Sequence, residues 1–165
     1  MKITKTVDYA APTDVVYAML TDPAFQERKC VEAGALRHDV TITAQGEGSR
    51  ILTRRDLPTQ GLPDFAKSLV GSTLAITETY RWGGAGADGS RDGDLTVEVA
   101  GAPIAMRATV RLAPSGTGSS LTVDGELKAS IPLLGGKIEK AAAPAVTDAM
   151  DSEYRTAQEW LVGRR

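Results

Sequence analysis

A regular alternation of polar and apolar side chains runs through most of this sequence and sets the strongest limit on its fold. From Leu36 to Ile131 apolar residues recur at every second position, and only a short segment around Asp64 to Val70 has helical spacing. Alternation with a period of two is typical of β-strands that bury one face. It predicts six strands, at approximately Leu36–Ala44, Ser49–Leu57, Ser72–Trp82, Asp94–Ala100, Ile104–Ala113 and Ser119–Ile131.

The links between these strands are short and rich in glycine and proline. Short links join sequential strands side by side and antiparallel, so we expect an antiparallel meander. One link, from Gly83 to Gly93, contains the spacing GxGxxG at Gly84, Gly86 and Gly89. Dinucleotide-binding folds need a helix directly after this motif, and here another strand follows. We therefore interpret the glycines as a flexible hairpin loop.

The two ends of the chain have a different pattern. A strand over Ile3–Tyr9 precedes two short helices, one over Pro12–Leu20 and one that starts at Asp22 and stops at Gly34. After the central strands, apolar residues return at helical spacing over Lys137–Leu161 and predict a long helix. Pro144 lies inside it, where a missing amide hydrogen predicts a kink or a restart of the helix.

Composition and charge exclude several classes of protein. The chain has 165 residues, 42% of them apolar, and 19 basic against 21 acidic side chains give a net charge of -2. This size fits one domain over residues 1–165. Because no block of lysine and arginine is present, we expect no nucleic-acid partner.

The cysteine and histidine content limits the kinds of metal site and disulfide that the chain can form, and its hydropathy limits where the protein can be located. The single cysteine, Cys30, rules out an internal disulfide, and with one histidine, His38, a Cys/His zinc site lacks ligands. We therefore expect no metal and no cofactor. No segment approaches the roughly 18 apolar residues of a membrane helix, and the start alternates instead of forming a signal segment. These features predict a cytoplasmic protein without stable membrane insertion.

Several junctions between the predicted elements resemble those of a known superfamily. They are Ala11-Pro12 before Val15–Leu20, Asp22–Phe25, Arg54–Pro58, Glu78–Trp82 and Ile131–Glu139. With the order of elements, they resemble the START-like (SRPBCC, helix-grip) superfamily and, within it, the bacterial family DUF2505. The resemblance implies an α+β fold in which a curved antiparallel sheet of about seven strands wraps around a long C-terminal helix, with two short helices after the first strand.

The predicted C-terminal helix has small residues where a sheet would face it. Alanines occupy positions 141, 142, 145, 149 and 157, while the facing strands carry residues of medium size. Because interiors are densely packed, this pattern predicts a ligand cavity between sheet and helix. The alternative is that the alanines reflect helix propensity and a close approach of helix to sheet, with no cavity.

Strand alternation also places polar residues on the concave face. His38 shares a face with Val40, and Glu78 shares one with Ile76, while on the strand between them either Arg55 or Arg54 faces inward. An inward Arg55 could pair with Glu78. The expected ligand-binding residues are His38, Val40, Arg55, Ile76, Glu78, Tyr80, Trp82, Val97, Met106, Ala145, Ala149 and Met150.

These residues favour a protein that binds or carries a small hydrophobic molecule such as a lipid, isoprenoid or polyketide. We assign no catalytic residue. One alternative, implied by the resemblance, is a cyclase, aromatase or hydrolase that uses the same cavity. In it His38 would shuttle protons, Arg55 would stabilise an anion and Glu78 would act as a base. A further alternative is a protein-interaction module, as in the co-chaperones of the superfamily.

Overall fold

One antiparallel sheet contains every strand of the described residues, 1–163. In this computed structural model the strands lie in the order β1-β7-β6-β5-β4-β3-β2, which confirms the predicted meander, with β1 added beside β7. The strands are β1 (Lys2–Tyr9), β2 (Arg37–Gln45), β3 (Gly48–Pro58), β4 (Thr73–Trp82), β5 (Arg91–Val99), β6 (Ile104–Ser115) and β7 (Gly118–Ala129).

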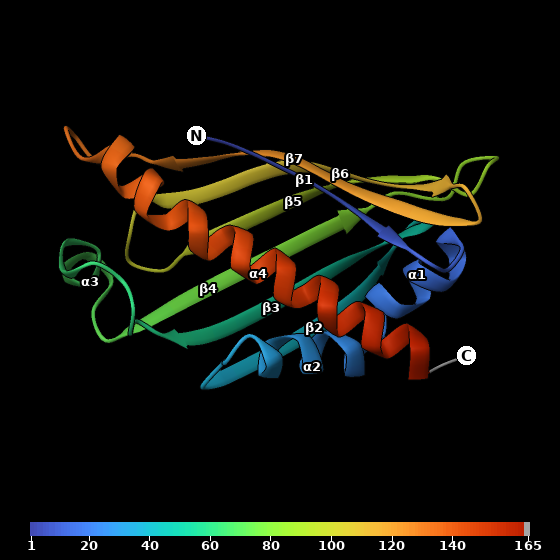
Figure 1. Ribbon diagram of the computed structural model, residues 1–165, viewed down its shortest axis with the longest axis horizontal. Helices are drawn as coiled ribbons and strands as arrows, with labels where there is room; N and C mark the ends of the chain where they lie inside the picture. The colour runs from blue at the N-terminus through green and yellow to red at the C-terminus, as the bar shows by residue number, and fades with distance from the viewer. Residues whose placement is uncertain (164–165) are drawn as a thin grey trace.

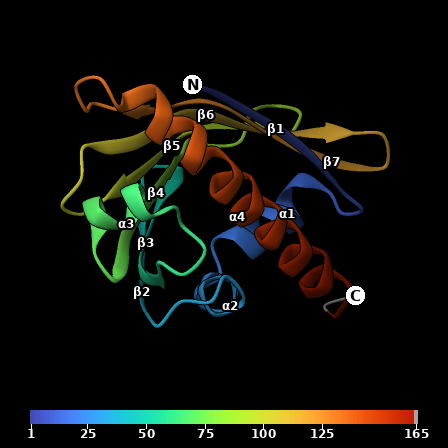
Figure 2. The ribbon, with the colours of Figure 1, turned by 60° about the vertical axis from the view of Figure 1, so that its left-hand side comes forward.

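Four helices accompany the sheet within residues 1–163. They are α1 (Thr13–Leu20), α2 (Pro23–Glu32), α3 (Asp64–Val70) and α4 (Gly135–Gly163). The long helix α4 crosses one face of the sheet diagonally, with α1 and α2 near its C-terminal half and α3 near its start (Figure 1). Seen from the side, the sheet curves from β1 and β7 over α4 towards β3 and β2 (Figure 2). The expected helix-grip architecture is therefore confirmed.

Sequence analysis expected a kink or a restart at Pro144; helix α4 continues through this residue as a single element, so the restart does not occur. Proline removes the hydrogen bond to the carbonyl of Lys140 one turn earlier. Both residues lie on the exposed side of the helix. None of the helices in residues 1–163 has the length and sustained hydropathy of a membrane-spanning segment.

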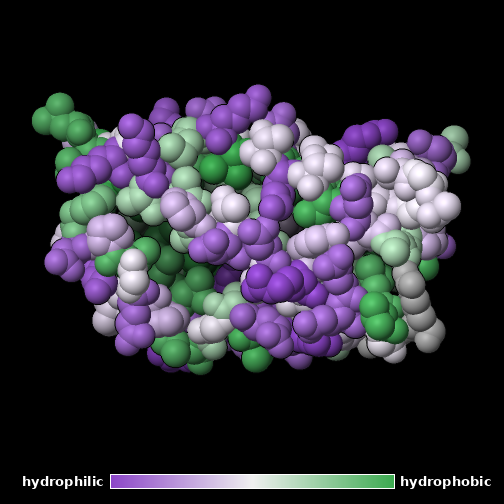
Figure 3. Space-filling model, in the orientation of Figure 1, coloured by the Kyte–Doolittle hydropathy of each residue, from purple (hydrophilic) through white to green (hydrophobic). Residues whose placement is uncertain are grey.

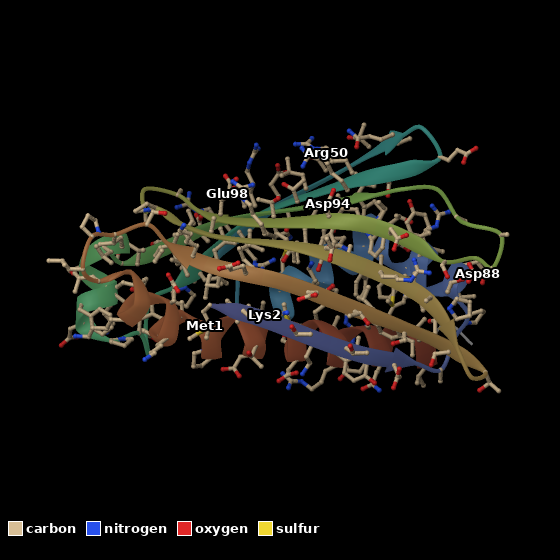
Figure 4. All side chains as sticks on the ribbon, turned by 90° about the horizontal axis from the view of Figure 1, so that it is seen from above. Met1, Lys2, Arg50, Asp88, Asp94 and Glu98 are labelled. Atoms are coloured by element: carbon tan, nitrogen blue, oxygen red, sulfur yellow. The ribbon has the colours of Figure 1, made fainter. Side chains whose placement is uncertain are left out.

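The packed core lies around the C-terminal half of α4. Phe25 of α2 is fully buried and meets Trp160 edge to face at 5.7 Å, while Ala157 is also fully buried. On the other side of the sheet the side chains are polar: Arg50, Asp94 and Glu98 point away from α4 (Figure 4). The C-terminal half of α4 is thus tightly packed, and any cavity must lie beside its N-terminal half.

The start of α2 depends on a side-chain cap that can be tested. The carboxylate of Asp22 accepts a hydrogen bond from the amide of Ala24 at 2.9 Å, and Pro23 occupies the first helical position. Replacing such a cap by alanine typically costs about 1 kcal/mol. We expect Asp22→Ala to lower the free energy of unfolding by that amount in urea denaturation, and Asp22→Asn to keep most of it. Equal losses in both variants would contradict a capping role.

Candidate functional site

A cavity of about 190 Å³ lies between the sheet and the N-terminal half of α4. Inward-facing residues of β3 to β7 form one wall, and α4 forms the opposite wall. Leu62, Ala66, Leu69 and Val70, from α3 and the segment before it, close one side. The space-filling view shows a hollow with hydrophobic residues inside it between α3 and α4 (Figure 3). The cavity is smaller than the roughly 300 to 1,000 Å³ of drug-sized sites, so it suits a small ligand.

The small residues of α4 create this space. Ala141, Ala142, Ala145 and Ala149 all line the cavity, so their methyl groups stand where larger side chains would fill it. Ala157, which the sequence pattern grouped with them, is instead fully buried in the packed core. The same residue type therefore opens a cavity in one half of the helix and allows close packing in the other.

Most of the expected binding residues lie on the cavity wall. They are Arg55, Ile76, Glu78, Tyr80, Val97, Met106, Ala145, Ala149 and Met150. The structure also decides between the two arginines of β3. Arg55 faces inward and is 7% exposed, while Arg54 is exposed on the outer face.

Three expected residues are not part of the wall. His38 is exposed; it lies opposite Arg55 in the β2–β3 register and so on the same face, but β2 is the edge strand of the sheet. Val40 lies on the same edge strand and is half-buried. Trp82 is buried beyond the cavity, where it stacks on Tyr80 with ring centres 6.2 Å apart. Alternation predicts the face of each residue correctly but not its position across or along the sheet.

Four ionisable side chains from four elements meet on the cavity wall. Lys29 of α2 places its Nζ 2.5 Å from Oε1 of Glu78 and 3.6 Å from Oε2 of Glu153 on α4. Arg55 donates a hydrogen bond from Nη2 to Oε2 of Glu78 at 3.4 Å. We call these four residues the ionic cluster. Because Glu78 contacts both cations, it is the centre of the cluster.

The two carboxyl groups of the ionic cluster differ in their proton affinity. Burial alone would raise the pKa of Glu78, but the adjacent Lys29 and Arg55 outweigh burial and hold it at about 2. Burial also raises the pKa of Glu153, and the charge of Glu78 adds to this effect, although Lys29 and Arg55 oppose it. Glu78 is therefore the firmly ionised member and Glu153 is the member that binds a proton more readily.

Sequence analysis missed Lys29 and Glu153, although helical spacing carried a signal for both. Lys29 follows the buried Phe25 by four positions, which places it on the buried stripe of α2. Glu153 follows Ala149 by four positions and therefore lies on the cavity face of α4. The sequence analysis assigned neither residue to a face of its helix.

Acid is expected to weaken the fold through Glu78. The folded-state pKa of Glu78, about 2, lies below the value of roughly 4.3 for an unfolded glutamate. Its ionised form therefore stabilises the protein fully at pH values above the unfolded pKa. This contribution disappears as the pH falls from about 4.5 towards 2. The difference in unfolding free energy between the wild type and Glu78→Gln, from urea titrations, should shrink over this range. A difference independent of pH would contradict the assignment.

A comparison with protein families covers nearly the whole chain. The family model described as "Protein of unknown function (DUF2505)" matches residues 4–161. The chain belongs to the DUF2505 family. Among curated proteins, none matches this DUF2505 chain.

Solved structures show that this DUF2505 chain has a START-like fold. A STAR-related lipid transfer protein from Xanthomonas axonopodis is 12% identical with a TM-score of 0.63, over 97% of this chain and 85% of that one. A START superfamily protein from Mycobacterium smegmatis is 14% identical with a TM-score of 0.56, over 97% and 98%. The di-domain ARO/CYC protein StfQ of steffimycin biosynthesis is 12% identical with a TM-score of 0.65, over 99% of this chain and 51% of StfQ.

Proposed function

We propose that this DUF2505 chain binds and carries a small hydrophobic molecule, such as a lipid, an isoprenoid or a polyketide, between the sheet and α4. The observation that supports the proposal is the cavity of about 190 Å³ whose walls are mainly aliphatic. Removing apolar ligand surface from water yields about 25 cal/mol per Å², which supplies the driving force. The START-like fold, shared with a protein named for lipid transfer, agrees with such a role.

An enzyme in the same cavity is the second candidate. The ionic cluster supports it, because Glu153 can accept a proton and Arg55 can stabilise an anion within an otherwise apolar site. The fold shared with the ARO/CYC protein StfQ agrees with this candidate. His38 no longer belongs to it, since that side chain is exposed on the edge strand and does not line the cavity.

Native mass spectrometry of freshly purified protein, followed by organic extraction, tests the proposal. We expect a copurified apolar molecule at one per chain. Adding candidate lipids to emptied protein should raise its melting temperature, because a ligand at about 100 times its dissociation constant adds about 2.7 kcal/mol of stability. Protein that is empty when isolated and unaffected by every lipid would contradict the carrier role. A molecule released with an altered mass would favour the enzyme.

A further inference from the structure

The turn between β7 and α4 holds apolar side chains in solvent. Residues 131–134 have the sequence Ile-Pro-Leu-Leu, and we call them the apolar tip. Leu133 is fully exposed, at 104% of its reference area, and Leu134 is 44% exposed. Within residues 1–163, Leu133 is also the one non-glycine residue with a positive φ, 67°. Because leucine disfavours this conformation, the turn keeps an apolar side chain in water at a conformational cost.

The apolar tip lies at the same end of the molecule as the cavity. The amide of Ile138, which lines the cavity, donates a hydrogen bond to the carbonyl of Leu134 at 2.9 Å, so the tip is one helical turn from the cavity wall. Nζ of Lys137, near the start of α4, lies 4.5 Å from the ring centre of Phe65 on α3. The turn and α3 project at one end (Figure 1), and hydrophobic atoms protrude there, at the same end as the hollow between α3 and α4 (Figure 3). A partner that covers the tip therefore lies close to the cavity.

Basic residues flank the apolar tip on both sides. Between positions 128 and 140 the chain has three lysines, Lys128, Lys137 and Lys140, and one acidic residue, Glu139. All three lysines are exposed, and none of them forms a salt bridge within residues 1–163. The carboxylate of Glu139 is already engaged, because it accepts a hydrogen bond from the amide of Ala129 at 3.1 Å. The surface around the tip is thus positively charged, although the whole chain has a net charge of -2.

We propose that the apolar tip docks this protein on an anionic lipid bilayer. Exposed leucines enter the interfacial region of a bilayer, and the lysines beside them are attracted to anionic headgroups. On the neighbouring α3, Asp64 and Lys67 offset each other and do not oppose this attraction. A second copy of the chain fits the tip less well, since a symmetric contact would bring two positively charged tips together.

Docking of this kind is peripheral, because only side chains of one turn enter the membrane. It brings the cavity end of the molecule, with α3 and the start of α4, to the bilayer surface. An apolar ligand then has a short path between membrane and cavity. Bilayer docking goes beyond the proposed carrier function, and either property can fail without the other.

Flotation of the full chain with lipid vesicles tests the docking without any added ligand. We expect mixed vesicles of phosphatidylglycerol and phosphatidylcholine to bind at least about tenfold more tightly than vesicles of phosphatidylcholine alone, since each lysine near an anionic surface contributes about fivefold. High salt should remove most of this difference by screening. Equal binding to the two kinds of vesicle, or binding to neither, would overturn the inference. Neither outcome bears on the proposed function, which copurification of an apolar molecule tests.

Leu133→Ser should weaken binding to the mixed vesicles about tenfold, because it removes the most exposed apolar side chain of the tip. Leu36→Ser is the matched control: Leu36 is 63% exposed but precedes the edge strand β2, away from β7 in the sheet. Leu133→Gly separates docking from folding, since glycine adopts a positive φ without strain. It should melt no lower than the wild type and bind as weakly as Leu133→Ser. A lower melting temperature in Leu133→Gly, or equal binding of Leu133→Ser and Leu36→Ser, would contradict a docking role for Leu133.

Lys140→Glu and Arg155→Glu separate the charge of the tip from the charge of the whole protein. Both residues are exposed on α4, Lys140 near the tip and Arg155 in the C-terminal half, and both changes lower the net charge equally. We expect Lys140→Glu to weaken binding to the mixed vesicles at least about tenfold and Arg155→Glu to leave it nearly unchanged. Equal effects would show that binding follows net charge and not the tip. Sedimentation velocity tests the other occupant: a wild-type dimer that Leu133→Ser dissociates would assign the tip to a second copy and overturn the inference.

Discussion

Glu78→Gln should lower the free energy of unfolding by about 3 to 5 kcal/mol at pH 7. Glu78 is the centre of the ionic cluster, and its loss leaves two buried cations, Lys29 and Arg55, with a single carboxylate, that of Glu153 at 3.6 Å from Lys29. An uncompensated buried charge is among the largest single sources of instability. For a protein of this length, the change corresponds to a melting temperature about 6 to 20 °C lower. Urea denaturation and differential scanning calorimetry measure the two quantities.

Glu159→Gln is the matched control for this prediction. Glu159 pairs with Arg28 at 2.8 Å, a close ion pair like that of Glu78, but the two side chains are 63% and 40% exposed. Exposed ion pairs contribute at most about 1 kcal/mol. If Glu78→Gln cost no more than Glu159→Gln, the ionic cluster would have no structural role at neutral pH.

Ala149→Phe should abolish ligand binding while the free energy of unfolding stays equal or rises. Ala149 lies on the cavity wall in the middle of α4, so a phenyl ring there would occupy the space that the ligand needs. Filling an existing void adds apolar contacts and is usually tolerated. The measurement compares the amount of copurified ligand and the thermal shift with added lipids in variant and wild type, together with urea denaturation.

Two further phenylalanine variants of α4 serve as controls, one on the exposed side of the helix and one in the buried core. Thr147→Phe adds a ring on the exposed side of the same helix and should keep ligand binding. Ala157→Phe adds a ring in the fully buried core and should cost about 1 to 3 kcal/mol through overpacking. A loss of stability in Ala149→Phe as large as that in Ala157→Phe would show that the space is already filled and would refute the cavity.

Register explains why part of the site could be predicted and part could not. Alternation places Glu78, Ile76 and Tyr80 on one face, because side chains of a strand point to opposite sides in turn. It left two choices on β3, where a shift by one residue exchanges Arg55 for Arg54. The structure resolves the choice through pairing of Gln45 with Gly48 across the β2–β3 turn, which sets Arg55 beside Ile76 and opposite His38.

The sequence by itself determined the strands, the helices and the small residues along one face of α4, because these follow from local periodicity and side-chain size. Only the tertiary structure decided that the cavity spans the N-terminal half of α4 and that Lys29 and Glu153 join Arg55 and Glu78. The physical reason is that periodicity specifies the direction of a side chain from its own element. Which charges meet in an apolar interior depends on how α2 and α4 pack against the curved sheet, and residues far apart in the chain set that packing.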